Sequence, residues 1–284
     1  MLTLTKRNLK IYFANPVSVF MSCLGALIAF FLYIIFLQKQ LVNGWKMLAH
    51  PNKLLDLWII AGIVAIAGIT TSFQGLNQFV DDRVNRTSDD LRLTDISPLF
   101  QSLSYVLSAS LISFVMQIFV FAIVTIYFSL TDHIKIFVND LWPSLGIMLL
   151  AAVVDTVLNL IIVAFIHKGK TFNIMSSILG ALSGFLVASY FPIGLLPKVA
   201  QDLVKLTPGS YQAIFMRNLL MSDQIKKQVP TTLVKRFKNF LGCQIKLDGY
   251  LLTDEQVVFV LAGMGIILLL VVAFINLVIN RKKK

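Results

Sequence analysis

The sequence has few residues that could hold a metal ion or a covalent framework. Its 284 residues include two cysteines and three histidines. Cys23 falls in the first long apolar run and Cys243 in a connection far along the chain, so we do not expect them to pair within one chain. The histidines, His50, His133 and His167, lie in three separate connections. The sequence therefore predicts no disulfide scaffold and no metal site in this chain.

Charge is almost missing from six long apolar stretches. Each is long enough for the ~20 residues with which a helix crosses a ~30 Å hydrocarbon core. Backbone in lipid must satisfy its own hydrogen bonds, so such stretches are helical. A soluble helical core would need polar stripes at a 3.6-residue period, and residues 257–279 have none. We therefore predict an all-α membrane protein with six transmembrane helices, at about 17–37, 57–80, 103–130, 142–166, 172–196 and 257–279.

The net charge of +11 indicates topology and not a nucleic-acid partner. With a cytoplasmic N-terminus, the two short outer loops hold only Lys39, Lys46, Lys53 and Lys135. The positive-inside rule then places both termini of this multi-pass protein in the cytoplasm. The inner segments hold the larger basic set: Lys6, Arg7, Lys10, Arg83, Arg86, Arg92, Lys168, Lys170, Arg281, Lys282, Lys283 and Lys284.

The whole chain, 1–284, is predicted to be a single transmembrane domain with surface helices at two places. In residues 1–16, Lys6, Arg7 and Lys10 share one arc of a helix, which predicts an amphipathic helix in the membrane interface. A disordered basic leader is the alternative. The outer segment, 197–256, is expected to carry short helices at about 199–206, 211–220 and 231–241.

The inner segment, 81–101, is the most polar connection between two spans. Asp89 or Asp90 can cap a short helix there, and Pro98 can close or redirect it. The segment is too short to fold as a domain. A short helix in this place has free sides, so we expect it to contact something outside the bilayer.

Asp155 is the only acidic residue within a predicted span. An ionisable group at membrane depth is costly and is by default a functional hypothesis. Asn159 lies one turn further on and shares its face. The pair is either part of a translocation pathway or a source of hydrogen bonds between helices. Gln74, Asn77 and Gln117 are weaker instances that we expect to serve packing.

No nucleotide site is expected in this chain. Gly169, Lys170 and Thr171 match the end of a phosphate-binding loop, but Ala164 stands where its first glycine is required. The segment also follows a span and not a strand. No nucleophile–base pair or carboxylate pair suggests an active site. If the chain takes part in active transport, its energy must come from an ion gradient or a partner ATPase.

Two motifs in the right order resemble the type-2 ABC exporter permeases, and the likeness covers nearly the whole chain. Asp81-Asp82-Arg83, followed by residues 89–98 (DDLRLTDISP), is similar to the family's coupling segment. Residues 184–197 (GFLVASYFPIGLLP) are similar to its outer turn, and Pro208, Ser210 and Arg217 to the element that follows. The long segment 222–256 and the shortage of glutamate around the coupling segment depart from the pattern.

The resemblance implies an exporter in the plasma membrane of a bacterium, moving a drug-like, peptide or lipid-like substrate. A separate ABC-type ATPase would bind ATP and Mg²⁺, and a second permease subunit, identical or different, would complete the pathway. This chain would be no enzyme and bind no cofactor itself. The resemblance also implies the site residues: Asp89, Asp90, Leu91, Arg92, Asp95, Ser97 and Pro98 for coupling, and Gly184, Pro192, Gly194 and Pro197 for the outer turn.

Two other functions remain open from the sequence. One is a gradient-driven secondary transporter in which Asp155 carries a proton. The other is a non-transporting membrane protein, such as an immunity protein. Neither alternative needs an ATPase partner.

Overall fold

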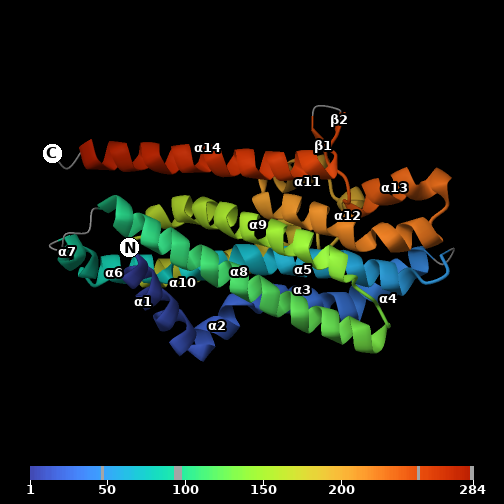
Figure 1. Cartoon of the computed structure of the whole chain (residues 1–284), viewed down its shortest axis with the longest axis horizontal. Coiled ribbons are helices and arrows are strands. Elements are labelled where there is room, and N and C mark those ends of the chain that lie inside the picture. The colour runs from blue at the N-terminus through green and yellow to red at the C-terminus, as the bar shows by residue number, and fades with distance from the viewer. Residues whose placement is uncertain (46–47, 93–97, 248–249, 282–284) are drawn as a thin grey trace.

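The structure is a computed structural model that describes the chain except residues 46–47, 93–97, 248–249 and 282–284. For residues 88–89, 92, 98–99, 246–247, 250 and 274–281 it describes the backbone but not the side chains. It is a bundle of helices (Figure 1). The elements are α1 (Leu2–Ala14), α2 (Pro16–Ser22), α3 (Leu24–Leu32), the π-helix η1 (Tyr33–Leu37), α4 (Gln38–Gly44), α5 (Pro51–Gly75), α6 (Asn77–Val84), α7 (Thr87–Arg92), α8 (Pro98–Thr131), α9 (Val138–Ala164), α10 (Gly169–Leu186), the 3₁₀ helix η2 (Ile193–Leu195), α11 (Lys198–Leu206), α12 (Pro208–Gln228), α13 (Thr231–Leu241), the strands β1 (Lys246–Leu247) and β2 (Tyr250–Leu251), which pair antiparallel, and α14 (Asp254–Arg281).

In the described part of the chain, 5 helical stretches are long and apolar enough to cross a membrane: Leu24–Gly44, Pro51–Val84, Phe100–Thr131, Val138–Ala164 and Asp254–Ala273. The helical membrane architecture is thereby confirmed, whereas the count of six is not.

The predicted span at 172–196 accounts for the difference. Its helix, α10, has 18 residues and ends at Leu186, a length of about 27 Å. The helix ends there, because Ala188 adopts a φ of 51° and the backbone N–H groups of Ser189 and Tyr190 both donate to the carbonyl of Gly184. The apolar sequence continues through this turn, which is why hydropathy alone overestimated the span.

The first and second spans also begin and end elsewhere than predicted. The first was expected at 17–37, but a break at Cys23 separates α2 from α3, and the helix continues through η1 to Gly44. The second was expected to start at residue 57, whereas α5 starts at Pro51 and so includes Asp56. The Tyr33 hydroxyl in η1 donates to Asp56 at 2.7 Å. Asp155 is therefore not the only acidic residue within a span.

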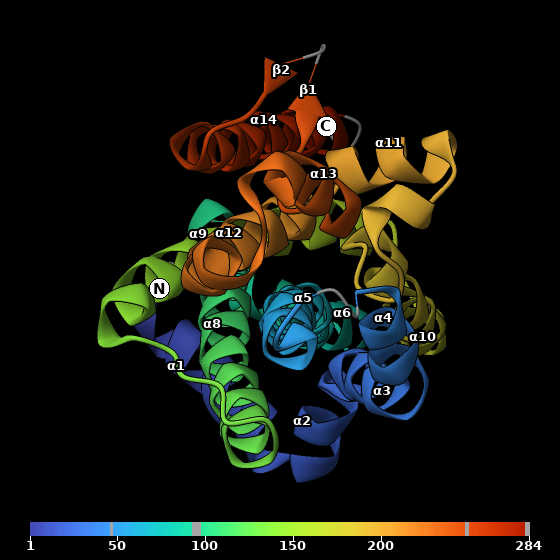
Figure 2. The same cartoon turned by 90° about the vertical axis from the view of Figure 1, so that its right-hand side faces the viewer.

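Helix α5 is the central element of the bundle. Figure 2 shows it surrounded by other helices, and it packs against α3, α8, α9, α10 and α12. A Cβ on Gly68 would lie 3.3 Å from Asp155 Oδ2, and one on Gly75 would lie 2.9 Å from the Cα of Ala109. Glycine at these positions lets α8 and α9 approach α5 closely.

Helix α1 forms as predicted, so the disordered leader is excluded, but its buried face is a protein contact. Leu4, Thr5, Asn8 and Tyr12 are buried, and α1 packs against α8. The Asn8 amide donates to Ser108 at 3.3 Å. The interfacial amphipathic helix remains a prediction for the opposite, exposed face.

The two ends of the bundle differ in content. The N-terminus, α6, α7 and the last described turn of α14 lie at one end, and α4, α13 and the β1–β2 hairpin lie toward the other (Figure 1). Short helices at 199–206 and 231–241 are confirmed as α11 and α13, whereas α12 extends well beyond the predicted 211–220. This arrangement places the coupling and outer segments at opposite ends.

Candidate functional site

A buried carboxylate joins α1 to α6 at the start of the inner segment. Asp82 in α6 is 2% exposed. Arg7 donates to both of its oxygens, at 2.7 and 2.8 Å, Gln78 donates at 2.7 Å, and the Tyr105 hydroxyl donates at 2.5 Å. Hydrogen bonding to Asp82 raises the pKa of Arg7, so the guanidinium stays charged. A bidentate pair of this kind fixes orientation as well as distance.

The predicted coupling residues divide between α7, α8 and undescribed positions. Asp89, Asp90, Leu91 and Arg92 belong to α7, where Asp90 is exposed and Leu91 is partly buried. Pro98 is the first residue of α8. Asp95 and Ser97 lie outside the described residues.

The predicted cap of this helix is wrong. Arg86, with a φ of 59°, interrupts the helical backbone after α6, and α7 starts at the next residue, Thr87. Asp89 and Asp90 therefore lie within α7 and not at its cap. Pro98 begins the next helix and does not close α7. Proline suits this place, since the first turn of a helix needs no donor from its backbone.

Helix α6, where the inner segment begins, also contacts the C-terminal end of α9. Arg83 Nη1 donates to the carbonyls of Ala164 and Ile166 at 3.0 and 3.1 Å, and its guanidinium lies 4.6 Å from the ring centroid of Phe79. These carbonyls belong to the C-terminal end of α9, where a cation is favourable. Helix α6 is thus fastened to α1, α8 and α9 together.

A polar cleft opens between α2–α3, α5–α6 and α10. Its volume is about 560 Å³, within the range of small-molecule sites. Gln74 crosses it, donating to Ser18 at 3.3 Å and accepting from Ser176 at 3.2 Å. Its polar lining carries no formal charge and comprises Asn15, Ser18, Ser22, Thr70, Gln74, Asn77, Asn173, Ser176 and Ser177. The cleft can therefore hold a ligand with uncharged hydrogen-bonding groups.

Asp155 and Asn159 lie together on the face of α9 that meets α5, as the sequence predicted. Asn159 donates to the carbonyl of Ile69 at 3.0 Å and to Ser72 at 2.8 Å, which confirms a hydrogen bond between helices at this residue. Asp155 is 1% exposed, and neither of its oxygens has a donor among the described residues. Its carboxyl group is therefore not part of the packing network that holds Asn159.

Glutamine side chains extend this polar layer to two further helices. Gln117 in α8 donates to Ser113 at 3.2 Å, and Gln212 in α12 donates to Gln117 at 2.6 Å. A Cβ on Gly68 would lie 3.1 Å from Gln117 Nε2, as well as beside Asp155. Gln117 thus serves packing, as expected, within a layer shared by α5, α8, α9 and α12.

Arg217 connects the predicted outer turn, 184–197, to the element that follows it. Its side chain is 1% exposed and donates to the carbonyls of Val187 and Ala188 at 3.3 and 3.0 Å and to that of Gly242 at 3.3 Å. Its guanidinium also lies 4.9 Å from the ring centroid of Trp58. Burial lowers the pKa of Arg217 to about 10, so it remains a cation at neutral pH. Carbonyl dipoles and an aromatic face stabilise that charge.

The predicted outer-turn residues divide between two contacts. A Cβ on Gly184 would overlap the ring of Tyr190, at 2.2 Å from its nearest atom, and one on Gly194 would meet Phe240 of α13 at 2.7 Å. Pro192 and Pro197 flank η2 on either side. The turn is thus packed against α13 and tied to α12 through Arg217.

The sequence analysis missed the two buried aspartates at the ends of α5–α6. Asp56 fell just outside a predicted span, and Asp82 was named only as part of the Asp81-Asp82-Arg83 motif, with no prediction that it is buried. Gln78 at four residues before Asp82 was the available signal, since i,i+4 partners share a helix face. The residues Arg7 and Tyr105 come from distant parts of the sequence, and no local pattern links them to Asp82.

Comparison with known proteins agrees with these features. Residues 52–280 match the family described as ABC-2 family transporter protein. This range runs from the first turn of α5 to the last turn of α14 and includes the α6–α7 segment, the outer turn and Arg217. No curated protein matches the chain significantly. Because the match covers most of the sequence, the chain belongs to the ABC-2 family of membrane transporter proteins.

Proposed function

We propose that this chain is the membrane-spanning permease subunit of an ABC exporter in a bacterial plasma membrane, with both termini in the cytoplasm. A separate ABC-type ATPase subunit, which holds ATP and Mg²⁺, docks on α7. A second permease subunit completes the pathway. The cargo is a drug-like, peptide or lipid-like molecule.

The fastening of α6 is the observation that carries this proposal. Helix α6 directly continues the central helix α5 and leads into α7, and Asp82 and Arg83 tie it to α1, α8 and α9. A displacement of α7 by a docked ATPase would therefore reach several spans at once. Packed elements of this kind have discrete alternative arrangements, which suits alternating access.

The polar cleft supports the expected class of cargo. Side chains such as Gln74, Asn77 and Asn173 offer both donors and acceptors, while Val17, Ile28 and others supply apolar wall. An amphipathic molecule with hydroxyl or amide groups fits this lining. A strongly charged cargo does not, because none of the described residues that line the cleft is charged.

The test is a charge reversal in α7. We expect Asp90→Arg combined with Arg92→Asp to leave the permease folded and in the membrane, but to weaken co-purification of the ATPase and to uncouple hydrolysis from export. Charge complementarity sets register and specificity at such contacts. The matched control reverses the exposed pair Asp223 and Lys227 of α12, 2.7 Å apart, at the outer end. Full ATPase binding and transport in the α7 variant would contradict the proposed docking site.

A second candidate function rests on Asp155. Its carboxyl group is buried without a donor in the described structure, which suits a residue that carries a proton in a gradient-driven transporter. Transport that survives ATP depletion, fails on collapse of the proton gradient and is abolished by Asp155→Asn would favour this function over the first.

A further inference from the structure

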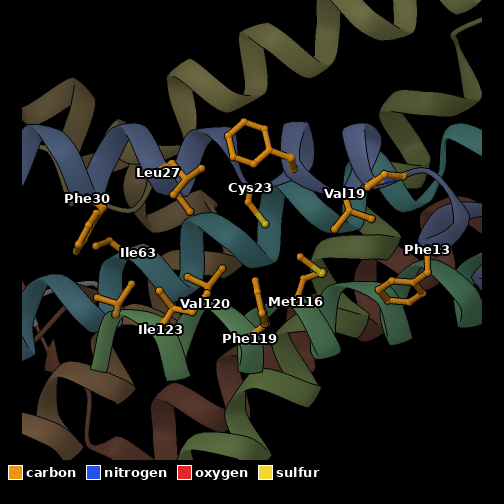
Figure 3. A pocket seen from close by; sticks show the side chains of 14 residues that line it. Phe13, Val19, Cys23, Leu27, Phe30, Ile63, Met116, Phe119, Val120 and Ile123 are labelled. Atoms are coloured by element: carbon orange, nitrogen blue, oxygen red, sulfur yellow. The ribbon is translucent and has the colours of Figure 1, made fainter. Parts of the chain in front are cut away.

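An apolar groove runs along the outside of the bundle between α2–α3 and α8. Figure 3 shows Val19, Cys23 and Leu27 on one wall facing Met116 and Val120 on the other. Its volume is about 470 Å³. Apart from the Cys23 thiol, no lining residue carries a polar side chain: Phe13, Pro16, Val19, Phe20, Cys23, Ala26, Leu27, Phe30, Ile63, Met116, Phe119, Val120, Ile123 and Val124.

The groove has a buried floor and an exposed rim. Ala26, Ile63 and Met116 are at most 3% exposed, whereas Phe20 and Phe119 are 57% and 55% exposed. The floor is thus formed by buried side chains of α3, α5 and α8, and the exposed rim by side chains of α2 and α8. The wall on α8 belongs to a stretch long and apolar enough to cross a membrane, Phe100–Thr131, and the α3 part of the other wall belongs to a second such stretch, Leu24–Gly44. This part of the groove therefore faces hydrocarbon and not water.

The two ends of the groove are defined by different groups. Near one end, the ring of Phe30 contacts Tyr127 and Phe128, with centroids 5.0 and 6.0 Å apart. The other end is bounded by Phe13 of α1. From Met116 to Val124 the α8 lining of the groove is about 12 Å long at 1.5 Å per residue. The groove therefore fits within one leaflet, which is half of a ~30 Å hydrocarbon core.

Positive charge lies beyond the α1 end. Lys6 and Lys10 are exposed. Lys10 follows Lys6 by four residues and Phe13 follows Lys10 by three, so the three side chains share one face of α1. A molecule seated in the groove and leaving it past Phe13 would therefore meet these two ammonium groups. Arg7 is held by Asp82 at 2.7 Å and is committed elsewhere.

We propose that this groove binds one acyl chain of an anionic phospholipid from the leaflet in which α1 lies, with the headgroup on Lys6 and Lys10. The apolar lining and a length that fits within one leaflet select an acyl chain, and the two lysines select a negative headgroup. Each lysine near an anionic surface contributes on the order of 1 kcal/mol. Together they give a preference of about 30-fold for an anionic over a zwitterionic lipid, by the usual conversion of free energy to affinity.

The first test maps the lipid on the unmodified protein. The permease is reconstituted with phosphatidylglycerol that carries a photoreactive diazirine on an acyl chain, and cross-linked peptides are identified by mass spectrometry. We expect adducts concentrated in residues 13–30 and 116–124. Adducts spread evenly over exposed apolar faces, such as that of α14, would overturn the proposal.

The second test uses native mass spectrometry of lipid retained by the purified permease. Val120→Trp fills the groove and is expected to abolish retention of phosphatidylglycerol, whereas Ile126→Trp, on an exposed face of the same helix outside the lining, retains it. Equal retention by both variants would refute the site. Absence of lipid from the wild type, together with cross-linking between copies at Phe119→Cys, would assign the groove to a second copy of the chain instead.

The headgroup is tested separately. Lys6→Gln with Lys10→Gln is expected to remove the preference of about 30-fold for phosphatidylglycerol over phosphatidylcholine. The control, Lys168→Gln with Lys170→Gln, removes the same charge from exposed positions before and within the first turn of α10 and should keep the preference. A preference unchanged in the Lys6/Lys10 variant would overturn the assignment of the headgroup.

Discussion

Removal of the Asp82 carboxylate should loosen the junction between α1, α6 and α8. Asp82 accepts hydrogen bonds from Arg7, Gln78 and Tyr105, and its side chain is 3% exposed. Breaking a buried ion pair costs about 3–5 kcal/mol. The Arg7 side chain is 35% exposed and can regain water, so we expect the low end of this range, about 3 kcal/mol, for Asp82→Ala.

The assay is unfolding of the detergent-solubilised permease by increasing SDS, followed by circular dichroism. Asp81→Ala is the matched control, because Asp81 is adjacent and only partly buried, and its carboxylate accepts a hydrogen bond from Asn77 at 2.7 Å. It should cost about 1 kcal/mol or less, the net contribution of one hydrogen bond. Equal shifts of the unfolding midpoint in the two variants would refute the assigned role of Asp82.

Three further outcomes are expected. Arg217→Met should destabilise the permease by about 3 kcal/mol or more, since three carbonyl groups lose their buried donor. The control Arg236→Met, on the exposed face of α13, should change the free energy of unfolding by no more than ~0.5 kcal/mol in the same SDS titration. Similar unfolding midpoints for the two variants would argue against the buried network. Asp155→Asn should fold and, under the exporter proposal, keep transport in vesicles; a folded variant without transport supports the proton carrier. In a cysteine-free background, Lys235→Cys should react with an impermeant maleimide in intact cells and Lys168→Cys only after permeabilisation, and the reverse pattern would invert the topology.

Long uncharged runs predicted most of the fold because length and apolarity are local properties of the sequence. The apolar runs at 103–130 and 142–166 correspond closely to α8 and α9. The end of α10 was not predictable in the same way, since Val187 to Leu196 is as apolar as a span. The helix ends because Gly184 leaves room for the ring of Tyr190 and Ala188 adopts a positive φ, and hydropathy carries no information on either feature.

The site was predictable only where its partners are near one another in sequence. The spacing of Asp155 and Asn159 on one helix face was enough to place both in the interior. The junction at Asp82 was not foreseen, because Arg7 precedes it by 75 residues. Similarly, the basic arc of α1 predicted exposure correctly for Lys6 and Lys10, but gave no sign that Arg7 would turn inward to a carboxylate.

The close glycine contacts of α5 restrict the kind of movement that this helix can transmit. At Gly68 and Gly75 the neighbours lie so near that even a methyl group would meet Gln117, Asp155 or Ala109. Rotation of α5 about its own axis would carry bulkier side chains, such as Ile69 and Phe73, into these narrow places. Tilting, or sliding of whole neighbours along its length, keeps the glycines opposite their partners. Under the proposed docking on α7, a displacement of the α6–α7 end would therefore reach the far end of α5 as a tilt or a slide and not as a twist.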